Sequence, residues 1–130
     1  MEDKKLIDIA EEARKKAYAP YSHFCVGAAL LCEDGSVYTG CNIENASFSP
    51  TCCAERVAIF KAVSDGKTRF SAIAIVGGKR DGEKILCYPC GVCRQTICEF
   101  CDGDMRIITS DGGQAEIATL GELLPNRFKF

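Results

Sequence analysis

The sequence has 130 residues, the length of one ordinary domain, which buries roughly two-thirds of the surface that its unfolded chain exposes. Apolar residues make up 47% and charged residues 26% of the sequence, a balance that excludes a disordered or fibrous protein. Sixteen basic and eighteen acidic side chains give a net charge of -2, which argues against a polyanionic partner such as a nucleic acid.

The ten cysteines are the most unusual feature of the composition. The opening residues, Met1–Lys5, do not resemble the start of a signal peptide, and no apolar run approaches the roughly 18 residues of a membrane span. We therefore expect a cytoplasmic protein in a reducing compartment, with no membrane partner. Clustered thiols in such a protein are typically metal ligands, catalytic groups or small core residues rather than disulfides.

The first part of the chain predicts a helix followed by a hairpin. Apolar residues at helical spacing predict an amphipathic helix over residues 3–18, which must stop before Pro20. Residues 24–32 are apolar on both alternating faces, as in a strand that is covered on both sides. Asp34-Gly35 is a hairpin-turn signal, so residues 36–42 should form a second, antiparallel strand.

The rest of the chain alternates helical and extended patterns. Apolar spacing predicts, in chain order, a helix over 53–64, a strand over 71–76, a helix over 91–100, strands over 105–109 and 114–119, and a helical turn over 121–124. Helices between later strands favour a mixed sheet sandwiched by helices, with the later strands parallel through right-handed crossovers. Because no linker or repeat divides the sequence, we expect a single α/β domain over residues 1–130.

Two segments stand where such folds place their sites, at the start of a helix that follows a strand. Cys53 and Glu55 open one predicted helix, and Pro89, Cys90 and Cys93 open the next. Helix N-termini stabilise thiolates, and two cysteines three residues apart lie on one helical face. Three thiolates would make a zinc site with an open fourth position, which is typical of catalytic rather than structural zinc. The nearby glutamate could then accept a proton from a bound water.

Spacing alone leaves three other interpretations of the thiols open. Cys87, Cys90 and Cys93 match the start of an iron–sulfur cluster motif. Cys90 and Cys93 alone match a thioredoxin-like redox pair. A non-enzymatic zinc module would recruit a fourth thiol, Cys87 or Cys52. The first two interpretations leave Cys53 and its nearby glutamate unexplained.

The same residues carry a family resemblance. Cys53-Ala54-Glu55 followed by Pro89-Cys90-x-x-Cys93 resembles the three-cysteine form of the zinc nucleobase-deaminase signature. Further segments resemble the small homotetrameric cytidine deaminases, so that the resemblance covers about residues 5–128 in all. These segments are Tyr18–Ser22, Phe24–Leu30, Asn42–Ala46 and Glu122–Pro125.

The resemblance implies a fold, an activity and an assembly. The fold is a three-layer α/β/α arrangement with a mixed five-stranded sheet, assembled as a homotetramer with shared active sites. The activity is hydrolytic deamination of cytidine and 2'-deoxycytidine to uridine and 2'-deoxyuridine with release of ammonia, a reaction of pyrimidine salvage. One zinc ion per subunit would carry the hydroxide that attacks C4. The alternative enzyme is a deaminase of the same fold that acts on another aminopyrimidine nucleoside of the blasticidin type.

The resemblance also implies roles for individual residues. Cys53, Cys90 and Cys93 would hold the zinc, with Glu55 as the catalytic base and then acid. Arg56 would withdraw negative charge from the thiolates. Tyr88 departs from the small residue that is common at its position, but its carbonyl remains. The implied substrate contacts are Phe24 against the base, Asn42 and Glu44 on the sugar hydroxyls, backbone groups of Ala54 and Tyr88 on the pyrimidine edge, and Phe128 from an adjacent subunit.

Overall fold

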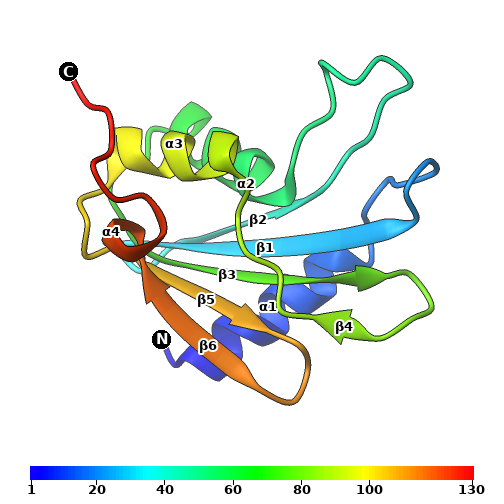
Figure 1. Cartoon of the computed structure of the whole chain (residues 1–130). Helices are drawn as coiled ribbons and strands as arrows, with labels where there is room; N and C mark the ends of the chain where they lie inside the picture. The colour runs from blue at the N-terminus through cyan, green and yellow to red at the C-terminus, as the bar shows by residue number, and fades with distance from the viewer.

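The computed structural model describes all of residues 1–130, and every predicted helix and strand is present (Figure 1). In chain order the elements are α1 (Asp3–Arg14), β1 (Phe24–Cys32), β2 (Val37–Cys41), α2 (Ala54–Ser64), β3 (Phe70–Lys79), β4 (Lys84–Ile85), α3 (Gly91–Phe100), β5 (Arg106–Ser110), β6 (Ala115–Thr119) and α4 (Leu120–Leu123).

The strands form one mixed sheet in the order β2-β1-β3-β5-β6, with β4 paired to β3 beside this path. The parallel pair is β3 with β5, and every other pairing is antiparallel. The sheet therefore has six strands, one more than the five predicted. The sequence did not indicate β4, because a strand of two residues is too short to show alternation. The expectation of parallel later strands is wrong for β6, since residues 111–114 are too few for a crossover and suffice only for a hairpin.

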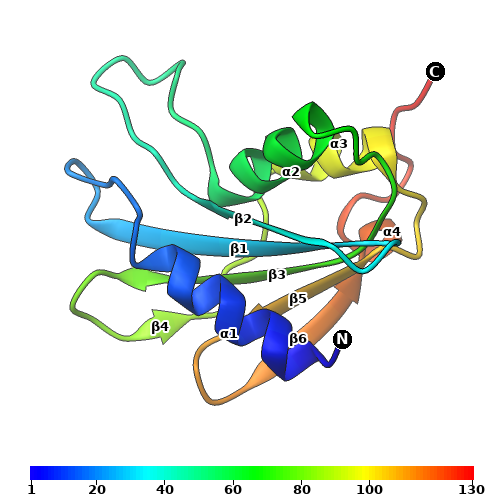
Figure 2. The same ribbon diagram turned by 180° about the vertical axis from the view of Figure 1, so that it is seen from behind.

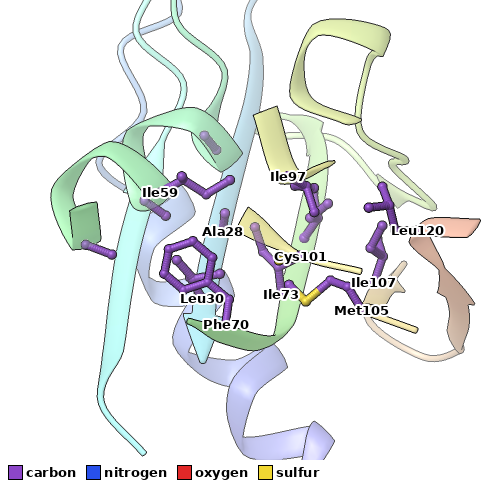
Figure 3. Close-up of a cluster of buried hydrophobic side chains, with 14 of the residues drawn as sticks. Ala28, Leu30, Ile59, Phe70, Ile73, Ile97, Cys101, Met105, Ile107 and Leu120 are labelled. Carbon is purple, nitrogen blue, oxygen red and sulfur yellow. The ribbon is translucent and has the colours of Figure 1, made fainter. Parts of the chain in front are cut away.

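Helix α1 covers one face of the sheet, and α2 and α3 cover the other (Figures 1 and 2). The larger core lies under α2 and α3 and contains 17 buried residues, among them Ile73, Ile97 and Ile107 (Figure 3). A smaller core of 7 buried residues lies under α1. Strand β3 contributes Ile73 to the first core and Ala74 to the second, which is the period-two alternation of a strand buried on both faces.

Helix α1 ends at Arg14, four residues before the predicted end at residue 18. The chain must leave the helix there because Tyr18 pairs with the strand-like segment after β2. The Tyr18 amide donates to the carbonyl of Asn42 at 2.9 Å, and the Glu44 amide donates to the carbonyl of Tyr18 at 2.9 Å. This isolated bridge sets the position of Glu44 at the end of the sheet where the candidate site lies.

Gly40 allows α2 to pack closely on β2. A Cβ atom at this position would lie 2.3 Å from the carbonyl oxygen of Ala54 and 2.6 Å from the amide nitrogen of Ala58. Both neighbours are backbone atoms of a helix and have no flexible side chain to move aside. The absent side chain at Gly40 therefore sets how close the start of α2 lies to the sheet.

We expect Gly40→Ala to lower the free energy of unfolding by about 1–3 kcal/mol through overpacking. Urea denaturation of the zinc-loaded chain measures this loss. Gly113→Ala is the matched control, because its new Cβ would meet nothing closer than Asp111 Oδ1 at 3.8 Å. Equal unfolding midpoints for the two variants would show that α2 shifts freely on the sheet.

Candidate active site

Three thiols from two helix N-termini converge at one end of the sheet. Cys53 is the N-cap of α2, Cys90 is the N-cap of α3, and Cys93 lies in the first turn of α3. Their Sγ atoms all lie within 4.8 Å of one another, and those of Cys53 and Cys90 are 3.9 Å apart. Each N-terminus adds partial positive charge that favours the thiolate form. The juxtaposition predicted from the sequence is therefore present.

This donor set fits a zinc ion with one open vertex. Thiolates are soft ligands that bind zinc well, and three of them leave one position of a tetrahedron free. No further histidine, cysteine or carboxylate atom joins the cluster. Cys87 packs instead against Gly77, and burial raises its pKa to about 11. Cys52 exchanges backbone hydrogen bonds with Ile43, and burial raises its pKa as well. The geometry thus disfavours the four-thiol zinc module and the iron–sulfur cluster.

Arg56 lies beside the thiols and offsets their negative charge. Its Nη2 atom donates to Cys53 Sγ at 3.4 Å, and this hydrogen bond raises the pKa of the guanidinium further above its already high value. Hydrogen bonds from Cys93 and from Arg56 lower the pKa of the Cys53 thiol to about 5. The Nε atom of Arg56 is buried without a partner, so this side chain has one donor still free inside the protein.

Glu55 lies in the first turn of α2 and is only 4% exposed. Burial raises the pKa of its carboxyl to about 7, and the negative charge of Cys53 adds to the increase. A carboxyl group with a pKa near neutrality can both accept and donate a proton at physiological pH. The environment of Glu55 therefore suits a general acid and base.

A cavity of about 380 Å³ opens beside the thiols, within the size range of small-molecule sites. Its wall is largely apolar, and no lysine, arginine or histidine lines it. Of the residues implied by the family resemblance, those in its wall are Phe24, Asn42, Glu44, Cys53, Ala54, Glu55, Tyr88 and Cys90. Cys93 is buried behind the wall and Arg56 lies outside it.

Glu44 is held as an ionised acceptor at the mouth of the cavity. One carboxylate oxygen accepts from the amides of Tyr21 and Ser22 at 3.0 and 3.1 Å, and the other accepts from the Ser22 hydroxyl. These hydrogen bonds, that of the Ser22 hydroxyl above all, keep the pKa of Glu44 below its usual value. Ser22 lies within a motif that carries the family resemblance, but the motif alone does not indicate this role.

The side chain of Asn42 makes two hydrogen bonds to the backbone of β1. Its Oδ1 accepts from the amide of Val26 at 2.8 Å, and its Nδ2 donates to the carbonyl of Phe24 at 2.8 Å. The side chain thus continues the pairing of β1 beyond the end of β2. One amide hydrogen and one acceptor lone pair remain for a ligand.

Arg94 contacts the backbone next to Cys90, and no motif in the sequence indicated this contact. Its Nε donates to the carbonyl of Pro89 at 2.7 Å, and its Nη1 donates to the carbonyl of Leu123 at 2.6 Å. It therefore ties the segment that carries Cys90 to the C-terminal part of the chain. A cation in the first turns of a helix opposes the helix dipole, and that signal could have drawn attention to Arg94.

Phe128 lies away from this chain's own cavity. The residue is 65% exposed, and its ring packs edge-on against that of Phe130, with ring centroids 5.4 Å apart. Its carbonyl accepts from Gln95 Nε2 at 3.1 Å, on the helix that carries Cys90 and Cys93. The contact expected of Phe128 therefore requires the cavity of another subunit.

Comparison with known proteins decides the family. Residues 1–109, which include all three thiols and Glu55, match the model of the cytidine and deoxycytidylate deaminase zinc-binding region. The chain belongs to this deaminase family. Membership confirms the resemblance drawn from the motifs, identifies the protein as a zinc-dependent enzyme, and makes the three-thiol cluster the place for the metal.

Relatives and solved structures cover nearly the whole chain. The cytidine deaminase of Sporosarcina psychrophila is 53% identical over 129 residues, covering 98% of this chain and 92% of the relative. That of Halalkalibacterium halodurans is 47% identical, covering 98% and 95%. The crystal structure of the cytidine deaminase from Burkholderia pseudomallei superposes with a TM-score of 0.90 at 43% identity, covering 98% of this chain and 100% of that one. None of the helices combines the length and apolar character that crossing a membrane requires.

We expect the protein to bind about one zinc ion per chain and to lose it when Cys53, Cys90 or Cys93 is replaced by alanine, since two thiolates leave too few ligands for a tight site. Inductively coupled plasma mass spectrometry of the purified variants measures the zinc content. Cys52→Ala and Cys87→Ala are the matched controls and should retain the metal. Loss of zinc from either control would indicate a fourth thiol ligand.

Proposed function

We propose that the protein catalyses the hydrolytic deamination of cytidine and 2'-deoxycytidine to uridine and 2'-deoxyuridine, with release of ammonia, as a step of pyrimidine salvage. One zinc ion would be held by Cys53, Cys90 and Cys93. The observation that carries this proposal is the buried carboxyl of Glu55, which lies in the same cavity wall as the thiols of Cys53 and Cys90. We further propose that residues 1–130 act as one catalytic domain.

The chemistry needs an activated water and a proton carrier. Zinc bound at the thiols would lower the pKa of a coordinated water and so supply a nucleophile at neutral pH. Glu55 takes the proton of the attacking water and delivers it to N3 of the pyrimidine. The same carboxyl then takes the remaining proton from the new C4 hydroxyl and passes it to the amino group, so that the C4–N bond breaks and ammonia leaves. Arg56, through its hydrogen bond to Cys53, limits the negative charge of the three thiolates.

The rest of the cavity suits an uncharged nucleoside. The aromatic side chain of Phe24 would lie against the base, while backbone groups of Ala54 and Tyr88 would bind the pyrimidine edge. The Glu44 carboxylate would accept hydrogen bonds from sugar hydroxyls, helped by the free amide hydrogen of Asn42. A 5'-phosphate would meet carboxylates and no cation in this wall, which favours nucleosides over nucleotides.

A second candidate substrate has support from one comparison. The blasticidin-S deaminase of Bacillus cereus is 30% identical to this chain over 131 residues, covering 98% of this chain and 92% of that protein. An aminopyrimidine nucleoside of that type presents the same C4 amino group to Glu55. The Asn42-Ile43-Glu44-Asn45 segment favours ordinary ribonucleosides, and the activity test therefore includes both substrates.

We also propose a homotetramer with shared active sites in the reducing cytoplasm. The long loop between β2 and α2 projects from the body of the molecule and carries Phe48, which is 87% exposed (Figure 1). An exposed aromatic on a projecting loop is typical of an interaction surface. Phe128 would reach a neighbouring cavity. All ten cysteines are free, as the thiols of a zinc site must be. Sedimentation velocity of the zinc-loaded chain tests the assembly.

The zinc-loaded protein is expected to deaminate cytidine and 2'-deoxycytidine, and Glu55→Gln is expected to lose about 10²–10⁴-fold in kcat because it cannot carry the proton. Loss of ultraviolet absorbance measures the reaction on cytidine, 2'-deoxycytidine, cytosine, adenosine and blasticidin S. The variant should keep its zinc, because Glu55 is not part of the thiol cluster. Turnover of blasticidin S alone would favour the second candidate, and full activity of Glu55→Gln would exclude the role of this residue.

Arg56→Gln should keep zinc at stoichiometric loading but lower kcat by about 10- to 100-fold, because the thiolates then hold more negative charge against the bound water. Steady-state kinetics and zinc content are measured on the same preparation. Arg69→Gln is the control, since that guanidinium is paired with Glu33 on the surface. Unchanged turnover with retained zinc would show that Arg56 contributes packing only and does not tune the charge of the thiolates.

A further inference from the structure

The segment between β4 and α3, residues 86–90, forms one wall of the candidate site without belonging to any helix or strand. It runs from β4 in the sheet to α3 in the helical layer (Figure 1). Both Tyr88 and Cys90 line the cavity. The positions of a zinc ligand and of the Tyr88 carbonyl thus depend on a short stretch of irregular chain, which needs anchors from elsewhere in the fold.

The downstream anchor is Arg94, which binds the Pro89 carbonyl. The upstream anchor lies on the edge strand β6, where the Tyr88 hydroxyl donates to the carboxylate of Glu116. Glu116 is half-buried near the start of β6 and has no other hydrogen bond through its side chain. The two residues are 28 positions apart in the sequence.

The register of the sheet explains why Glu116 points toward this segment. Glu116 is directly opposite Thr109 in the antiparallel pair of β5 and β6, so their side chains share one face. Ile107, two residues before Thr109 on β5, belongs to the core under α2 and α3. Because alternate residues of a strand share a face, Thr109 and Glu116 both face the helical layer, to which segment 86–90 leads.

Proline links Tyr88 closely to the zinc ligand. Pro89 has a fixed φ angle and is fully buried, and the residue before a proline is confined to extended backbone conformations. Few backbone rotations therefore separate the Tyr88 side chain from Cys90. A restraint on the Tyr88 ring is transmitted along this stiff stretch to the thiol.

We propose that the hydrogen bond between Tyr88 and Glu116 tethers segment 86–90 to β6, and that Glu116 is a positioning residue for the Cys90 thiol and for the Tyr88 carbonyl. The effect on the carbonyl rests on the proposed function, whereas the effect on the thiol requires only that the cluster binds zinc. A small side chain at position 88 would be too short to reach Glu116 on β6. The hydrogen bond to β6 therefore depends on a tyrosine at this position.

Zinc release separates the tether from the catalytic reaction. The zinc-loaded wild type, Tyr88→Phe, Glu116→Ala and the double variant are mixed with excess 4-(2-pyridylazo)resorcinol, and the rate of zinc transfer to the dye is followed. Each single variant should release zinc about three- to tenfold faster, the range of a lost hydrogen bond to a partly exposed charged group. The double variant should be no faster than the singles, because both remove the same bond. Glu116→Gln should stay near the wild type, since its amide oxygen still accepts.

Kinetics on cytidine give the second readout. The Tyr88 carbonyl binds the substrate in the ground state and the transition state alike, so the KM of Tyr88→Phe and Glu116→Ala should rise about three- to tenfold with little change in kcat. If the wild type does not deaminate cytidine while the zinc-release pattern holds, the proposed function fails and the tether stands.

Tyr38 and Asp65 supply a matched control. The Tyr38 hydroxyl also donates to a carboxylate, that of Asp65, which follows the C-terminal end of α2, whereas Cys53 precedes its N-terminal end. Tyr38→Phe and Asp65→Ala should leave zinc release and KM unchanged. Unchanged zinc release in Tyr88→Phe and Glu116→Ala, equal acceleration in the control pair, or additive effects in the double variant would each overturn the tether.

Discussion

The structure depends on the convergence of two helix N-termini at one end of the sheet. Helices α2 and α3 place three Sγ atoms within 4.8 Å of one another, an arrangement that thiolates alone would oppose by charge repulsion. The positive ends of both helices and the guanidinium of Arg56 reduce that repulsion before any metal binds. The start of α2 also buries the carboxyl of Glu55, and this burial raises its pKa to about 7. Metal binding and proton transfer therefore have one structural origin.

The packing of the helices on the sheet holds these N-termini in place. The core under α2 and α3 combines branched side chains such as Ile59 and Ile73 with small ones such as Ala58. At Gly40 the backbone of α2 lies so near β2 that no side chain fits between them. Strands β3 and β5, which pair in parallel, contribute Ile73 and Ile107 to the core that these helices cover. Stability and the geometry of the site are thus coupled through the position of α2.

Irregular segments form part of the cavity wall, beside residues of β1 and α2, and side-chain hydrogen bonds restrain these segments. Ser22 holds Glu44, the amide of Asn42 extends the pairing of β1, and Arg94 holds the carbonyl of Pro89. The bond between Tyr88 and Glu116 belongs to this pattern. A rigid sheet with loops fixed in this way gives a preorganised pocket.

The sequence by itself determined most of the local elements, the thiols that can hold a metal ion and the family, because helical periodicity, turn residues and the cysteine motifs are short-range patterns. It did not determine where α1 ends, since that depends on a bridge between Tyr18 and a segment that follows β2. It also missed β4 and the antiparallel direction of β6, which follow from strand pairing. Arg94 and Glu116 act on partners up to 29 residues away in the chain. Only the folded sheet brings such residues together, because a hydrogen bond between distant positions has no periodic signature in the sequence.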